Sequence, residues 1–450
     1  MGQWLAVLVA GVHLAQGATS RPNILFLAID DQNDWIGCMG GHPQVKTPNI
    51  DRLAREGMMF RNAFVTTPLC SPARASFLTG QYARTHRVKG NGDNAALSHG
   101  LSSWPRLLHD SGYETAYVGK WHMGTDDSPR PGFDRWVSFR GQGQFDDPPL
   151  NIDGERLTRQ GYMTDLLSDY SVEFLKKSRG GKPFCLYLAH KAVHGPFTPA
   201  ARHAKLYSEQ TIRRAASAQD SLDGKPMLRR PLEQMGKKKG GGGGVGPSDE
   251  IILNQMRCLT SIDEGVGRIL EALEQNKTLD RTLVLFTSDN GYFWGEHGLG
   301  DKRAAYEESI RIPMVARYPK LIRRGAKADE MALNIDIAPT MLEAAGVAVP
   351  KPVEGRSLVP VMQGKPRGWR TSFLSEYYME QANARVASWE AVRTARWKYI
   401  RYFDLEGMDE LYDLQSDPLE LRNRIADGGA SAELNRLRKE LEHYRKGVPA

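Results

Sequence analysis

Cysteine is scarce in this chain of 450 residues, which has only Cys38, Cys70, Cys185 and Cys258. So few cysteines exclude a fold that is held together by disulfide bonds. If Cys70 has a chemical role, the other three can form at most one disulfide. Cys185 falls in a stretch that predicts a strand and Cys258 in one that predicts a helix, so we expect both to pack in the core.

Long apolar runs are missing as well. The run from Trp4 to Ala15 is shorter than the roughly 20 residues that a helix needs to cross a bilayer, and no later segment approaches that length. The small residues Gly17 and Ala18 that follow it suit cleavage by a signal peptidase. We therefore predict a signal peptide over residues 1–18, no membrane span, and an exported protein that is periplasmic or secreted.

A strong charge of one sign is also absent. Sixty Lys and Arg residues stand against 53 Asp and Glu residues, which leaves a net charge of +7. This excess mildly favours an anionic substrate but is too small to predict a nucleic-acid-binding protein. With 40% hydrophobic and 25% charged residues, the composition is that of a globular protein that can bury a large core.

Acidic and amide side chains follow two of the predicted strands. Residues 23–29 form a continuous apolar run that ends in Asp30 and Asp31, and residues 282–287 form another that leads to Asp289 and Asn290. Runs of this kind predict parallel strands covered on both faces, whose carboxyl ends lie at one edge of the sheet. These oxygens can share one hard cation there, although solvated loop acids are the alternative for either pair alone.

The most distinctive stretch surrounds Cys70. Ser71 can cap a helix and Pro72 suits its first turn, so we expect Cys70 just ahead of a helix N-terminus, where an anion is stabilised. Arg74 adds a planar set of donors suited to a tetrahedral oxyanion. A buried cysteine ahead of an ordinary helix is the alternative.

The pattern Cys70-x-Pro72-x-Arg74, followed by Leu78, Thr79 and Gly80, resembles the signature of type I sulfatases. The resemblance extends from residue 23 to about residue 425 and recurs at separate places in the expected order. It implies an α/β fold, an alkaline-phosphatase-like sandwich with a mainly parallel central sheet, plus a smaller C-terminal α+β subdomain with an antiparallel sheet. It also implies that a formylglycine-generating enzyme converts the cysteine to formylglycine.

The same resemblance implies roles for individual residues. One calcium ion is expected at a set of five ligands, which are Asp30, Asp31, Cys70, Asp289 and Asn290. The implied catalytic residues are Cys70 as nucleophile after conversion, Arg74 and Lys120 to hold the aldehyde hydrate, His122 to regenerate the aldehyde, His194 to protonate the leaving alcohol, and Lys302 to bind sulfate. His190 has no such match and is expected to be structural, and the role of His297 stays open.

The substrate prediction depends on residues 130–151. Their density of Gly, Pro and aromatic residues predicts a fixed loop without helix or strand, and the segment resembles that of glucosamine-6-sulfatases. This implies a sulfated carbohydrate substrate, with 6-O-sulfated N-acetylglucosamine as first choice. The alternatives are a broad sulfatase or arylsulfatase, a phosphoester or phosphonate hydrolase, which normally uses Ser or Thr or additional metals, and a non-catalytic glycan-binding protein.

Composition divides the chain further. We predict a catalytic region over residues 19–365 and a C-terminal subdomain over residues 366–450. Residues 200–249 contain paired arginines, three consecutive lysines and five consecutive glycines, which predict an exposed, flexible insertion that does not pack in a core. A lid that grips a polyanion is the alternative for this insertion.

Overall fold

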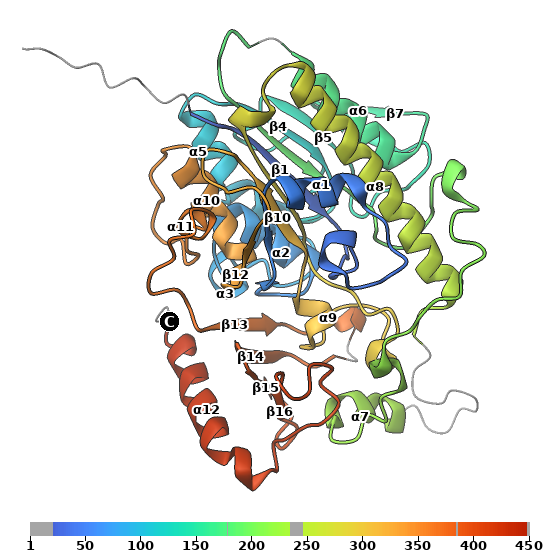
Figure 1. The fold of residues 1–450 in the computed structure, drawn as a ribbon, viewed down its shortest axis with the longest axis vertical. Helices are drawn as coiled ribbons and strands as arrows, with labels where there is room; N and C mark the ends of the chain where they lie inside the picture. The colour runs from blue at the N-terminus through green and yellow to red at the C-terminus, as the bar shows by residue number, and fades with distance from the viewer. Residues whose placement is uncertain (1–20, 178, 235–245, 384–385, 448–450) are drawn as a thin grey trace, which may run out of the picture.

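A computed structural model describes residues 21–177, 179–234, 246–383 and 386–447 of the chain. A sheet with helices on both faces forms the larger part, and a smaller sheet lies beside it, flanked by the last helix (Figure 1). The predicted signal peptide lies outside the described residues. No helix among the described residues has the length and apolar character needed to span a bilayer.

The large sheet has ten strands, and its five central strands run parallel. The sheet order is β11 (Ala326–Ala328), β2 (Met58–Phe60), β10 (Met314–Arg317), β9 (Thr282–Ser288), β1 (Asn23–Ile29), β8 (Phe184–Ala189), β4 (Glu114–Gly119), β5 (Arg135–Ser138), β6 (Pro149–Ile152) and β7 (Glu155–Thr158). Antiparallel pairs occur only toward the edges, at β10, β6 and β7. This arrangement confirms the predicted α/β fold with a mainly parallel centre.

Alternate residues of the central strands face two separate cores. In β1, Ile24 and Phe26 belong to one core and Leu25 and Leu27 to the other, and all four are buried. Burial on both faces explains why this strand is apolar throughout. Three helices cover one face: α1 (Pro48–Glu56), α6 (Met163–Lys176) and α8 (Asp249–Gln275). The opposite face carries α2 (Cys70–Thr79), α5 (Trp104–Asp110), α10 (Ile337–Ala344) and α11 (Val359–Met362).

The C-terminal part is an antiparallel sheet with one long helix. The strands are β13 (Ser372–Tyr377), β14 (Trp389–Thr394), β15 (Trp397–Tyr402) and β16 (Glu410–Asp413), and α12 (Ser431–Arg445) packs on them. The short strands β3 (Ala63–Phe64) and β12 (Ala332–Leu333) pair separately. Short helices complete the fold: α3 (Ala83–His86), α4 (Ala95–Gly100), α7 (Pro226–Gln234) and α9 (Glu307–Ile310). The exact division at residue 365 remains a prediction.

Two expectations are corrected. The segment 130–151 is not a loop throughout, because it contains β5 and the start of β6, which extend the large sheet. The first part of the expected insertion, residues 200–234, also packs on the fold, since Ile212, Leu222 and Met227 are buried. Its few apolar residues suffice because they enter existing cores as single side chains. The run of five glycines lies outside the described residues.

Candidate active site

Two acidic pairs meet at the carboxyl ends of β1 and β9. The strands are adjacent and in register to their last residues, so Asp30 and Asp31 leave the sheet beside Asp289 and Asn290. The backbone N–H of Asp31 donates to Oδ1 of Asp289 at 3.2 Å, and Nδ2 of Asn290 donates to Oδ1 of Asp31 at 2.7 Å. All four side chains are buried, which places this group of oxygens in a region of low dielectric.

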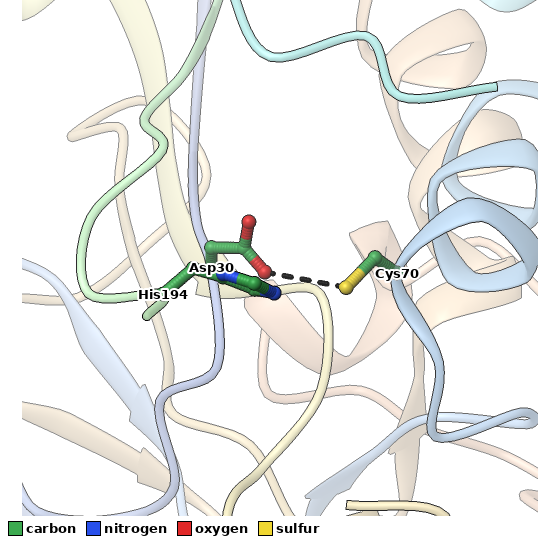
Figure 2. A group of neighbouring side chains, drawn as sticks. All are labelled: Asp30, Cys70 and His194. Atoms are coloured by element: carbon green, nitrogen blue, oxygen red, sulfur yellow. Dashed lines mark hydrogen bonds between the residues drawn. The ribbon is translucent and has the colours of Figure 1, made fainter. Parts of the chain in front are cut away.

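Cys70 faces the acidic pairs from the first turn of α2. Its Sγ lies 3.4 Å from Oδ1 of Asp30, and Figure 2 shows the two side chains facing each other. The helix begins at Cys70 itself with Leu69 in the capping position, so the expected cap at Ser71 is wrong. Ser71 instead donates its hydroxyl hydrogen to the backbone carbonyl of His122. Burial and the charge of Asp30 raise the pKa of the Cys70 thiol, so the unmodified side chain is a thiol and not a reactive thiolate.

Each of the three buried carboxylates has a close cationic partner, and Arg74 also lies 3.5 Å from Asp30. The pairs are Lys120 with Asp30, Arg74 with Asp289 at 2.8 Å, and Lys302 with Asp31 at 2.6 Å. Nζ of Lys302 donates to both carboxylate oxygens of Asp31. Burial alone would lower the pKa of Lys302, but the charge of Asp31 outweighs burial and raises this pKa well above its ordinary value. The cluster is therefore close to neutral in charge, and its cations are held beside the thiol.

The acids respond differently to this environment. Burial alone would raise the pKa of Asp30, but Lys120, His194 and Arg74 hold it well below its ordinary value. Burial and the neighbouring Asp30 raise the pKa of Asp289 to about 7. Carboxylates packed this closely need positive charge to ionise together, which is a condition that a bound cation satisfies.

The structure separates the candidate histidines into two groups. Nε2 of His194 lies 3.7 Å from Oδ2 of Asp31, and its ring points into the space between Asp30 and Cys70 (Figure 2). Burial, Lys120 and Lys302 lower the pKa of His194 to about 4. His122 is buried nearby, and burial and Lys120 lower its pKa well below the ordinary value.

The other two histidines lie apart from this group. His190 is buried with neither ring nitrogen hydrogen-bonded among the described residues, and its structural role stays a prediction. Nδ1 of His297 donates a hydrogen bond to the carboxylate of Asp220 at 2.7 Å, in the segment between β8 and α8. His297 therefore has a structural role, because this bond connects the segment between β8 and α8 to the loop after β9 that carries Lys302.

Four of the predicted metal ligands come within one coordination shell. One ligand atom from each of Asp30, Asp31, Cys70 and Asp289 lies within 4.8 Å of the others. Asn290 is their neighbour, and its Oδ1 is buried with no hydrogen-bond partner among the described residues. A buried acceptor without a donor costs free energy, so this oxygen fits a cation.

Two supporting residues were not predicted. Oδ1 of Asn91 accepts the N–H of Ser71 at 3.0 Å, which satisfies one of the free donors at the start of α2. Oε1 of Glu380, from the C-terminal sheet, accepts the N–H of Asn91 at 2.7 Å, and its other oxygen binds Arg303, next to Lys302. No local signal identifies either residue, because Asn91 reads as a turn and Glu380 is far away in the chain.

Comparison with known proteins gives two family matches. A model described as Sulfatase matches residues 22–347, which is more than half of the chain. A second model, described as N-sulphoglucosamine sulphohydrolase, C-terminal, matches residues 295–447.

Individual relatives cover nearly the whole chain. An N-acetylglucosamine-6-O-sulfatase of Bacteroides thetaiotaomicron is 32% identical, over 95% of this chain and 87% of its own length. The human N-acetylglucosamine-6-sulfatase is 29% identical, over 92% and 82%. A solved structure of a protein in complex with its substrate D-glucosamine-2-N,6-O-disulfate is 29% identical, with a TM-score of 0.86 over 95% of this chain and 98% of that one.

Proposed function

The chain belongs to the sulfatase family, and from this we propose that it removes sulfate from a carbohydrate, with 6-O-sulfated N-acetylglucosamine in a glycan as its preferred substrate. The observation that carries the proposal is the buried Cys70 thiol, which begins a helix and lies against three carboxylates and three cations. The substrate choice is supported by the relatives named above, which are N-acetylglucosamine-6-sulfatases or hold a 6-O-sulfated glucosamine.

We propose calcium as the cation, held by Asp30, Asp31, Asp289, Asn290 and the modified side chain at Cys70. The donors are hard oxygens, which suit calcium, whereas an unmodified thiol is a poor ligand for it. When bound, the cation polarises the sulfate and lowers the pKa of the nucleophile. It also adds positive charge to a cluster whose own charges balance, which favours an anionic ester.

Conversion of Cys70 to formylglycine by a formylglycine-generating enzyme completes the proposed site. The hydrated aldehyde supplies one hydroxyl for attack on sulfur and a second that permits release of sulfate by elimination. Arg74 and Lys120 hold this group, since both already contact the carboxylates beside it. Asp289 helps to accept the proton of the attacking hydroxyl, since its carboxylate lies beside Cys70.

His122 acts as the base that regenerates the aldehyde. Burial and Lys120 keep its pKa well below the ordinary value, so the neutral ring that can take a proton predominates at neutral pH. Its Nδ1 is buried without a hydrogen-bond partner among the described residues, which leaves that atom open to a group in the site.

Lys302 binds a sulfate oxygen, and His194 protonates the leaving alcohol. Without substrate, burial and the cations Lys120 and Lys302 keep His194 neutral. The negative charge of a bound sulfate ester offsets these cations and raises the pKa of His194, so the ring takes up the proton that it later donates. We also propose export of the protein, on the basis of the apolar segment within residues 1–18.

The experiment that tests this function uses protein co-expressed with a formylglycine-generating enzyme. Free sulfate is measured after incubation with 6-sulfated N-acetylglucosamine, with other sulfated sugars and with nitrophenyl sulfate, each with calcium and with a chelator. We expect the highest kcat/KM for the 6-sulfated sugar and loss of turnover with the chelator. Preference for another sugar would refute the substrate choice, and inactivity on every ester despite a confirmed aldehyde would refute the sulfatase reaction.

A further inference from the structure

Lys191 is a buried lysine next to the catalytic cluster that has no role in the mechanism above. It follows β8 by two residues and is 1% exposed. Its Nζ donates to the backbone carbonyl oxygen of Gly195 at 2.9 Å and lies 4.4 Å from the ring centroid of Phe145. No carboxylate among the described residues lies within ion-pair distance of it. A buried ammonium without an ion-pair partner costs free energy, which a packing residue of similar size such as Met avoids.

The carbonyl that Lys191 holds is also bonded to His194. Nδ1 of His194 lies 3.0 Å from the same oxygen of Gly195. A carbonyl oxygen only accepts hydrogen bonds, so Nδ1 must carry a hydrogen, and the two donors use both lone pairs of the oxygen. The tautomer and the orientation of the ring therefore follow from this one bond, and Nε2 is the nitrogen left to face Asp31 and Cys70.

We propose that Lys191 is a positioning residue for His194: its ammonium fixes the Gly195 carbonyl, and that carbonyl holds Nδ1 so that Nε2 faces the oxygen of the leaving alcohol. The inference rests on the proposed role of His194 as the acid. Burial, together with Lys120, lowers the pKa of Lys191 to about 8, in keeping with an ammonium retained at a cost. The aromatic face of Phe145 stabilises the charge that remains.

The leaving group distinguishes this role from simple packing. A sugar alkoxide needs a proton from His194 as it departs, whereas nitrophenolate leaves readily without one. A misplaced His194 therefore slows release of the sugar and has little effect on nitrophenyl sulfate. Loss of packing would lower the rate on both esters by the same factor, because it would reduce the fraction of folded enzyme.

The test compares Lys191→Met, Lys191→Arg, His194→Asn and the double variant Lys191→Met/His194→Asn, all in the converted enzyme. For Lys191→Met we expect kcat on 6-sulfated N-acetylglucosamine to fall by about 10-fold or more, with a change below about 3-fold on nitrophenyl sulfate. Lys191→Arg, which keeps the donor and charge, should restore part of the loss. The double variant should be no slower on the sugar than His194→Asn alone, because both changes remove the same interaction.

Equal losses on the two esters for Lys191→Met, or additive losses in the double variant, would overturn the positioning role while leaving the sulfatase proposal in place. If His194→Asn itself shows no dependence on the leaving group, the assignment of His194 as acid fails and this inference fails with it. Thermal unfolding of each variant shows whether the protein is folded. Should Lys191→Met not fold, Lys191→Leu, which also removes both the donor and the charge, provides the same comparison.

Discussion

Two buried clusters of charged side chains lie on either side of the loop that follows β9. The catalytic cluster consists of Asp30, Asp31, Asp289, Arg74, Lys120 and Lys302. The α9 cluster consists of Glu307, Glu308, Arg393, Lys398 and Glu420, where α9 meets the C-terminal sheet. Both bury charges that would be costly without partners, yet they differ in the ligand atoms that they bring together.

In the α9 cluster the ion pairs and hydrogen bonds join members of the cluster to one another, although Oε2 of Glu308 is buried without a hydrogen bond among the described residues. Lys398 lies 2.6 Å from Glu420 and 3.2 Å from Glu307, and the N–H of Glu307 donates to Glu420 at 2.8 Å. Beside the catalytic cluster, Oδ1 of Asn290 and Nδ1 of His122 are likewise buried with no hydrogen-bond partner among the described residues. The catalytic cluster differs because one ligand atom of each of its three acids lies within 4.8 Å of the others and of Sγ of Cys70. Buried charge with an unsatisfied atom therefore does not by itself identify a site, whereas ligand atoms that converge beside a cysteine at a helix N-terminus do.

Replacement of a buried cysteine should have the largest effect, but only in the catalytic cluster. Cys70→Ala removes the precursor of the nucleophile, so we expect sulfate release below detection with the fold retained. Cys185→Ala removes an equally buried thiol from β8 and should leave kcat within about 2-fold, at a cost of about 1–2 kcal/mol in the free energy of unfolding. Sulfate release and denaturant unfolding of both variants measure this, and residual turnover in Cys70→Ala would contradict it.

Two buried lysines sharpen the contrast. Lys398→Met leaves Glu420 without its cation, so we expect a loss of about 3–5 kcal/mol in the free energy of unfolding, with kcat per folded molecule unchanged. Lys302→Met removes the proposed sulfate ligand, and we expect kcat/KM to fall by about 100-fold or more. The free energy of unfolding measured in the presence of calcium should change little, because the bound ion still balances the charge of Asp31. Denaturant unfolding in calcium and initial rates separate the two effects. Equal destabilisation by both variants would remove the distinction.

A smaller effect is expected at Glu308. Burial and the neighbouring Glu296 and Glu420 raise its pKa well above the ordinary value of 4.5. Folded Glu308 therefore keeps its proton when the unfolded chain has lost it, so the free energy of unfolding falls as the pH rises from about 4.5 to the folded pKa. Gln cannot ionise, and Glu308→Gln should thus gain about 1 kcal/mol at pH 8 and nothing at pH 4. Urea unfolding at the two pH values checks this, and a gain of equal size at both would disprove the cause.

Much of the fold follows from local pattern. The apolar runs at residues 23–29 and 282–287 predict β1 and β9, and the amphipathic stretch before Gln275 predicts α8, because burial on two faces or on one stripe dictates which residues are apolar. The strands within residues 130–151 are harder to predict from the sequence, since β5 and β6 are short and lie toward the edge of the sheet. Their pairing depends on β4, which no local signal can supply.

The sequence by itself determined the family and the identity of the candidate residues, because Cys70-x-Pro72-x-Arg74 and the acidic pairs are contiguous motifs. Only the tertiary structure decided which carboxylate pairs with which cation, since those distances depend on the register of β1 with β9. It also brought Asn91 and Glu380 to the start of α2 and joined Lys191 to His194 through one carbonyl oxygen. Contacts between residues far apart in the chain leave no periodic or compositional trace, so they appear only once the chain is folded.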